Sequence, residues 1–281
     1  MRPIAELTPS AASAVRLVLT DIDDTLTHDG KLSAEAYVAL WELRAAGLWV
    51  VPVTGRPAGW CDAIARQWPV DAVIGENGAF VFYERDGGLQ SHFHPNAIAD
   101  ARAHVPQGSF PSHHAIERVR ARLTPVRDAI LQAVPGARVA KDQPYRIFDL
   151  AIDFREDPPD LGLTVADQIR AVAEQHGCVA KVSSIHVNCW FGDYNKLDMA
   201  RWMAGQLFGL DVVKHPERVL FVGDSPNDAP MFAGFPLGVG VANVRRFIDR
   251  MPSHPAFVAH AAGGAGFAEI ARVLLHARAA C

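Results

Sequence analysis

Two acidic side chains two positions apart, Asp21 and Asp23, follow a short apolar run that ends at Thr20. The run Val15–Thr20 has the composition of a buried strand, and in an open α/β sheet ligands bind at the carboxyl ends of the strands. Carboxylates there can share one bound cation, while one serves as nucleophile and the other as general acid. An aspartate-rich turn or helix N-cap is the alternative interpretation.

Two further segments have the residue types that bind phosphate. Thr54, Gly55 and Arg56 follow the apolar run Leu48–Val53, so that a hydroxyl and free backbone N–H groups come directly after a second predicted strand. Lys196 begins a predicted helix, where its point charge can neutralise a phosphoryl group and position the nucleophile.

A second group of acids follows the apolar run Val219–Val222. Asp224 has the oxygen ligands that Mg²⁺ prefers, and Asn227 and Asp228 come shortly after it. Each of these segments alone is a common loop. Their repeated position between a predicted strand and a predicted helix indicates one shared site.

The elements that must position these residues alternate between strands and helices, before residue 83 and again after residue 190. This alternation predicts an α/β fold, with a Rossmann-like, doubly wound parallel sheet. The predicted strands cover residues 15–20, 48–53, 72–75, 219–222 and 237–241, and the predicted helices cover 33–46, 59–68, 196–208 and 267–278.

The middle of the chain has a different pattern, in which a helix followed by two strands occurs twice. It predicts an inserted α+β domain at 84–190, with a core domain formed by 1–83 and 191–281. The predicted helices of the insert cover 115–133 and 164–176, and its strands cover 137–141, 145–154 and two runs around Ser183.

Composition excludes several classes of protein. The chain has 281 residues, 49% of them apolar and 21% charged, with a formal charge of −4. These values are typical of a globular protein and argue against a nucleic-acid binder. Four scattered cysteines without a C-x-x-C pair favour reduced thiols, and no apolar run approaches the roughly 20 residues of a membrane span. We therefore expect a cytoplasmic monomer or small homo-oligomer without nucleic-acid or membrane partners.

The segments described above resemble the four motifs of the haloacid dehalogenase (HAD) superfamily, most of whose members are phosphatases. The resemblance implies that Asp21 is the nucleophile and Asp23 the general acid/base. It implies phosphate binding by Thr54 and Gly55, and a third-motif role in catalysis and phosphate binding for Lys196.

The fourth motif of the superfamily resembles the segment from Gly223 to Asp228. In this resemblance Asp224 is a metal ligand, together with Asp21 and the backbone carbonyl of Asp23, and the implied cofactor is Mg²⁺. Asn227 contributes to phosphate binding, and Asp228 and Arg56 support the site.

The position of the insert, between the second and third motifs, resembles the type IIB subfamily with its C2B-type cap. That subfamily includes Cof-type, sucrose-phosphate and mannosyl-3-phosphoglycerate phosphatases. Glu76-Asn77-Gly78-Ala79 before the insert, Asn243 and the tail 263–269 also resemble it. Asp24 is a departure, because many relatives have glycine there.

Alternation along the last strand of the insert would place Ser184, His186 and Asn188 on one face, toward the cleft. Asp149 lies on the corresponding face of the predicted strand 145–154. Such groups suit sugar hydroxyls, although an ordinary solvated sheet face is the alternative. Arg146 and Lys141 are candidates for a second anionic group of the substrate.

These observations predict a phosphoric monoester hydrolase, a Mg²⁺-dependent phosphatase of a small phosphorylated metabolite, with a sugar phosphate as the expected substrate. Two alternatives remain open. One is a phosphomutase of the phosphomannomutase type, and the other is a catalytically silent relative that only binds a ligand.

Overall fold

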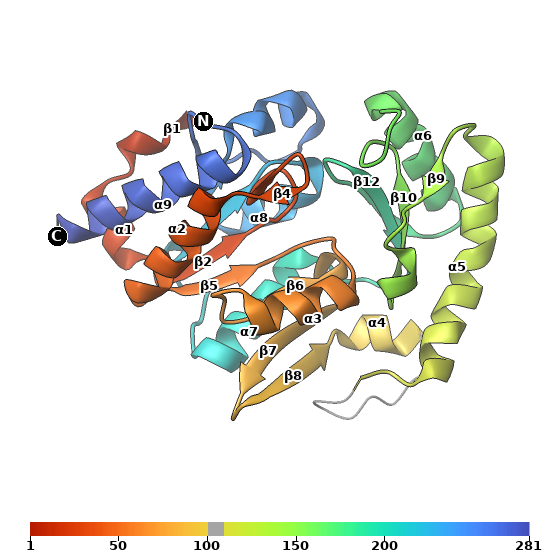
Figure 1. The fold of residues 1–281 in the computed structure, drawn as a ribbon, viewed down its shortest axis with the longest axis horizontal. Coiled ribbons are helices and arrows are strands. Elements are labelled where there is room, and N and C mark those ends of the chain that lie inside the picture. Colours follow the sequence, from red (N-terminus) through yellow and green to blue (C-terminus); the bar gives the residue numbers. More distant parts are fainter. Residues whose placement is uncertain (101–109, 281) are drawn as a thin grey trace.

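The centre of the molecule is a six-stranded parallel sheet with the order β1-β15-β14-β13-β2-β5 (Figure 1). The structure is a computed structural model that describes residues 1–100 and 110–280, so Cys281 and part of the predicted insert lie outside the described residues. The strands are β1 (Arg2–Pro3), β2 (Leu17–Thr20), β5 (Trp49–Pro52), β13 (Val219–Gly223), β14 (Leu237–Gly240) and β15 (Phe257–Val258).

Helices cover both faces of this sheet, which explains why its strands are apolar along their whole length. Leu17 and Leu19 of β2 pack in one cluster with Met199, whereas Val18 packs in the other with Leu40. The sheet is therefore doubly wound, and the predicted fold class is confirmed. The covering helices are α1 (Pro9–Ala14), α2 (Ala34–Ala45), α3 (Ala58–Gln67), α7 (Lys196–Phe208), α8 (Ala229–Gly234) and α9 (Gly263–Ala279).

Two small antiparallel sheets accompany the core sheet. β6 (Val73–Gly75), β7 (Phe80–Arg85) and β8 (Gly88–Phe93) form an antiparallel sheet, and β3 (Thr27–His28) pairs with β4 (Lys31–Leu32). The boundary predicted at residue 83 lies inside β7, and the pairing of β7 with β8 extends to Phe93. The hairpin of β7 and β8 therefore continues past the predicted boundary at residue 83. The division into two domains stays a prediction.

The insert has the predicted repetition of a helix followed by two strands, and its sheet is antiparallel with the order β11-β12-β10-β9. The strand predicted over 145–154 begins only at Asp149, because Gln143–Tyr145 form a 3-10 turn. The elements are α4 (Pro95–Asp100), α5 (His113–Ala133), β9 (Arg138–Val139), β10 (Asp149–Asp153), α6 (Gly162–Gln175), β11 (Val179–Val182) and β12 (His186–Trp190). Within 1–100 and 110–280, no helix has the length and apolarity needed to cross a bilayer.

Candidate active site

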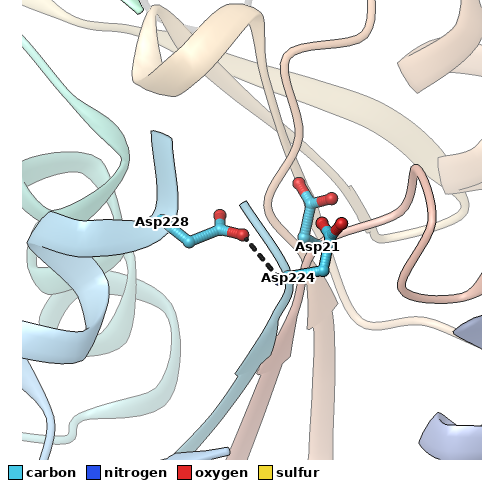
Figure 2. Close-up of side chains that lie close together, drawn as sticks. All are labelled: Asp21, Asp224 and Asp228. Carbon is cyan, nitrogen blue, oxygen red and sulfur yellow. Dashed lines mark hydrogen bonds between the residues drawn. The ribbon is translucent and has the colours of Figure 1, made fainter. Parts of the chain in front are cut away.

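Three buried carboxylates meet at the carboxyl ends of β2 and β13 (Figure 2). Thr20 is paired with Val222, and the N–H of Asp21 donates to the Val222 carbonyl at 2.8 Å, so the residues after these two strands are neighbours. One oxygen from each of Asp21, Asp224 and Asp228 lies within 4.8 Å of the other two. The parallel register thus brings together acids about 200 positions apart.

Lys196 provides a positive charge inside this cluster. Asn195 caps α7 by accepting hydrogen bonds from the N–H groups of Leu197 and Asp198, which positions Lys196 at the first turn. Its ammonium donates to Asp21 Oδ1 at 2.7 Å and to Asp228 Oδ1 at 2.8 Å. Burial lowers the pKa of Lys196, but the two carboxylates outweigh it and raise that pKa above its usual range. Lys196 is therefore charged.

The carboxylates outnumber the ammonium group. Burial raises the pKa of Asp21 and of Asp224 well above the usual value, and neighbouring carboxylates raise both further. Oxygen-only donors at this spacing are the coordination that a hard divalent cation such as Mg²⁺ takes. The Asn243 side chain donates to Asp224 Oδ2 at 2.9 Å and so helps to orient it. The residues present therefore fit a divalent metal.

A third carboxylate lies beside the two side chains predicted as metal ligands. Asp21 and Asp224 are together, and the third side chain is that of Asp228, which the sequence suggested as a supporting residue. The backbone N–H of Asp224 donates to Asp228 Oδ2 at 3.0 Å, which fixes this carboxylate in the cluster (Figure 2). The Asp23 side chain contacts Arg56, and metal binding by its backbone carbonyl stays a prediction.

The predicted phosphate-binding residues follow β5. The N–H of Thr54 donates to the Ile74 carbonyl at 2.9 Å, and its buried hydroxyl oxygen accepts from the N–H of Arg56 at 3.0 Å. A Cβ on Gly55 would lie 3.2 Å from Asn77 Nδ2, so only glycine leaves ordinary space there. Asn227, from the fourth motif, reaches the same place and donates to Asn77 Oδ1 at 3.5 Å.

Arg56 is buried and joins the core to the insert. Its guanidinium contacts both carboxylate oxygens of Asp23, and it also donates to Glu156 at 2.6 Å and to Asp142 at 3.3 Å. The indole ring of Trp60 lies 4.3 Å from its central carbon. Arg56 therefore contacts a predicted catalytic residue and two carboxylates of the insert at once, which its motif did not indicate.

The predicted cleft residues of the insert are all buried against the core. Asn188 donates to Asp149 Oδ2 at 2.8 Å, and its own Oδ1 would lie 3.4 Å from a Cβ on Gly55. His186 Nε2 lies 2.8 Å from a carboxylate oxygen of Glu156, and Ser184 is buried. Asn188 thus lies next to the Thr54–Gly55 segment, and contact of all these residues with a substrate stays a prediction.

The two cations suggested for a second anionic group both contact carboxylates of the insert. The Arg146 guanidinium is buried and donates to Asp142, to Asp149 and to the Gly55 carbonyl. Lys141 is 84% exposed and pairs with Asp157. Burial and these contacts argue against anion binding by Arg146, whereas anion binding by the exposed Lys141 stays a prediction.

Sequence reasoning missed the carboxylates of Glu156 and Asp142. Glu156 is placed by Asp153, whose Oδ1 accepts from the backbone N–H groups of Arg155 and Glu156 at 2.8 Å. Aspartate that bonds the backbone two or three residues ahead is a known turn signal, so the turn after Asp153 was recognisable. Its meeting with Arg56, 100 positions away, was not.

Comparison with known proteins agrees with this geometry. Residues 18–108 match the family model of haloacid dehalogenase-like hydrolases. No curated protein sequence matches the chain. Over these residues the predicted resemblance to the HAD superfamily is confirmed.

Solved structures with this fold match nearly the whole chain. The sucrose-phosphatase of Synechocystis sp. PCC6803, in complex with sucrose and phosphate, is 17% identical over 93% of this chain and 97% of its own, with a TM-score of 0.60. The C-terminal domain of the trehalose-6-phosphate phosphatase of C. albicans is 14% identical over 98% of both chains, with a TM-score of 0.64. A sugar phosphatase of HAD subclass IIB is 13% identical over 93% of this chain and 98% of its own, with a TM-score of 0.58.

Proposed function

We propose that the protein is a Mg²⁺-dependent phosphatase of a small phosphorylated metabolite, with a sugar phosphate as substrate. The observation that carries this proposal is the contact between Lys196 and Asp21 inside a cluster of buried carboxylates. The two named relatives are phosphatases of sucrose phosphate and of trehalose 6-phosphate, which supports the substrate class.

Asp21 is the nucleophile of the proposed reaction. Lys196 holds Oδ1, so that Oδ2 is the oxygen that attacks the phosphorus atom. The new Asp21–phosphorus bond forms an aspartyl-phosphate, and the bond from phosphorus to the leaving oxygen breaks. Lys196, Asn227, the Thr54 hydroxyl and the Gly55 backbone stabilise the negative phosphoryl oxygens, where most of the catalytic stabilisation is expected.

Asp23 moves the proton in both steps. As an acid it gives a proton to the leaving alkoxide, and as a carboxylate it then takes a proton from the water that attacks the aspartyl-phosphate. The second step releases inorganic phosphate and restores Asp21. Since Arg56 contacts both oxygens of Asp23 in the present arrangement, the leaving group must replace part of that contact.

Mg²⁺ would be held by Asp21, Asp224 and the backbone carbonyl of Asp23, with Asp228 beside them. When bound it would supply charge neutralisation for the phosphoryl group. This charge neutralisation is needed, because a phosphate dianion that enters this cluster meets three carboxylates and one ammonium group.

In this proposal the insert contacts the leaving group of the substrate. Residues 84–190 act as a cap over the core site, and Asp149, Ser184, His186 and Asn188 contact the hydroxyl groups of the substrate. The partner is a small molecule and not a nucleic acid or a membrane. A cytoplasmic location and a monomer or small homo-oligomer complete the proposal.

The test is phosphate release from a panel of sugar phosphates and p-nitrophenyl phosphate, with Mg²⁺ and without any bisphosphate activator. We expect wild-type turnover on at least one sugar phosphate and only background release from Asp21→Asn. Asp62→Asn, at a partly exposed position of α3, is the matched control and should keep wild-type turnover. Turnover retained by Asp21→Asn, or a wild-type protein that releases phosphate only with a bisphosphate activator, contradicts the proposal.

A further inference from the structure

The Asn77 side chain has a buried donor without an acceptor. Asn77 is 2% exposed, and its Nδ2 has no hydrogen-bond partner among the described residues. Its Oδ1, by contrast, accepts from Asn227 at 3.5 Å. Native structures seldom leave a buried donor unpaired, because the group loses its hydration and gains nothing in return. An acceptor atom of a bound ligand would satisfy the Asn77 Nδ2 donor.

The backbone around Asn77 is strained as well. Glu76, Asn77 and Gly78 have successive φ angles of 43°, 56° and 105°, in the left-handed region that side-chain-bearing residues rarely adopt. Strain of this kind persists only where the surroundings enforce it, and it gathers at functional sites.

The contacts on either side of Asn77 hold this turn in place. The buried Glu76 carboxylate accepts from the N–H groups of Ala58 at 3.1 Å and of Phe148 at 2.6 Å. On the other side, a Cβ on Gly78 would overlap the Asn195 carbonyl oxygen, just before Lys196. The backbone of Asn77 is thus held between the insert and the beginning of α7.

The unpaired donor lies where the proposed phosphate-binding segments meet. The N–H of Asn77 donates to the Thr54 carbonyl at 3.0 Å, and its Nδ2 is the atom nearest to a Cβ placed on Gly55. Asn227 contacts the same carboxamide from the fourth motif. The donor is therefore next to two segments that hold the phosphoryl group in the proposed function.

We infer that Asn77 is a further phosphate-binding residue, whose Nδ2 donates a hydrogen bond to a phosphoryl oxygen held by the Thr54–Gly55 segment. The inference rests on the proposed function and adds a residue to it. A neutral, preorganised donor stabilises developing charge on phosphoryl oxygens without further burial of charge. The strain and the unpaired group are then explained together.

The experiment uses Asn77→Gly, since glycine adopts this φ without strain and removes only the side chain. Its matched control is Asp86→Gly, which relieves a φ of 54° at the exposed tip of the β7–β8 hairpin. Binding of inorganic phosphate is measured by titration calorimetry in Mg²⁺ buffer. The kcat/KM is measured with p-nitrophenyl phosphate and with a sugar phosphate that the wild-type protein hydrolyses. We expect Asn77→Gly to weaken phosphate binding and lower both kcat/KM values by about 10- to 100-fold, while Asp86→Gly remains within about twofold of wild type.

A second variant, Asn77→Asp, keeps the size of the side chain and replaces the donor with a negative charge. It should bind phosphate more weakly than Asn77→Gly, and thermal unfolding of both variants verifies that they fold. Wild-type phosphate affinity in Asn77→Gly overturns the inference alone, as does a loss confined to the sugar phosphate, which would place Asn77 at the leaving group. Absence of phosphate binding and of turnover in the wild-type protein overturns the proposed function as well.

Discussion

The Arg56 guanidinium contacts the Asp23 carboxylate through Nε, at 2.9 Å from Oδ1 and 3.0 Å from Oδ2. The same group donates to two carboxylates of the insert, Glu156 and Asp142. One buried cation therefore holds both the proposed general acid and two segments of the insert. Movement of the insert away from the core removes two of the three carboxylates around Arg56, and so changes its hold on Asp23.

Arg56→Lys should separate the role of the planar guanidinium from that of its charge. One ammonium group cannot contact both oxygens of Asp23 and two further carboxylates at these positions. We expect kcat/KM for a substrate that the wild-type protein hydrolyses to fall by about 10- to 100-fold, because a single misplaced group at a catalytic site has effects of this size. Steady-state kinetics measure this, and Arg66→Lys, a partly exposed ion pair later in α3, is the control. Equal kcat/KM values in both variants would show that the charge alone suffices.

Glu76→Gln should weaken the attachment of the insert to the core. The carboxylate of Glu76 accepts backbone hydrogen bonds from Ala58, Ile147, Phe148 and Asp149, and every one of these groups is a donor. An amide would place its own donor against one of them, which costs about 1–3 kcal/mol of unfolding free energy. Urea unfolding measures the loss, with Glu84→Gln at an exposed position of β7 as control. Burial raises the pKa of Glu76 from 4.5 to about 8, so the loss should be largest below pH 4.5 and shrink as the pH rises toward 8, because the wild type then bears a buried charge.

Parallel strands made most of the core site predictable from sequence. Continuous apolar runs identify strands that are buried on both faces, and the acids that follow them must meet at one edge of the sheet. Asp21 and Asp224 are neighbours for this reason. The β7–β8 hairpin was missed, although Asp86-Gly87 at its tip is a strong hairpin signal.

The contacts between core and insert were beyond prediction, because loop conformation decides them. Alternation along β12 correctly grouped His186 with Asn188, but it could not show that both would be buried with acidic partners. Glu156 reaches Arg56 only because the turn after Asp153 directs it there. No periodic pattern links two loops that are this far apart in the chain.

The ion pairs of Glu156 should make part of the stability dependent on acid pH. Burial raises the pKa of Glu156, but the His186 hydrogen bond and the Arg56 charge outweigh it and lower that pKa from 4.5 to about 2. A lowered pKa means that the stabilisation is complete above about pH 4.5 and is lost as the pH falls toward 2.

Glu156→Gln should therefore be less stable than wild type at pH 6, by about 1–2 kcal/mol after allowance for solvent screening of this partly exposed group. The difference should shrink as the pH falls below 4.5. Denaturant unfolding at a series of pH values measures it. Glu42→Gln, on the exposed side of α2, is the control. A difference that is constant with pH would mean that the ion pairs do not carry the effect.

Asp224→Asn should have opposite effects on stability with and without Mg²⁺. In EDTA the wild-type cluster holds three buried carboxylates against one ammonium group, and burial together with the acidic neighbours raises the pKa of Asp224 well above its usual value. An amide removes this unfavourable burial, and its oxygen can still accept from Asn243 while its nitrogen donates to the Thr25 hydroxyl. We therefore expect the metal-free variant to unfold at a higher temperature than the metal-free wild type.

Addition of Mg²⁺ should reverse this order, because a cation that binds only the folded state stabilises it, by an amount that grows with the logarithm of its concentration over its dissociation constant. The wild-type melting temperature should rise with Mg²⁺ concentration, by the equivalent of about 2.7 kcal/mol at 100 times the dissociation constant, and that of Asp224→Asn should hardly change. Asp167→Asn, on α6 outside the cluster, tests for a general effect of Mg²⁺ and should respond as wild type does. A Mg²⁺-dependent rise that survives in Asp224→Asn would place the ion elsewhere. In that case the acids at the ends of β2 and β13 would not form the metal site.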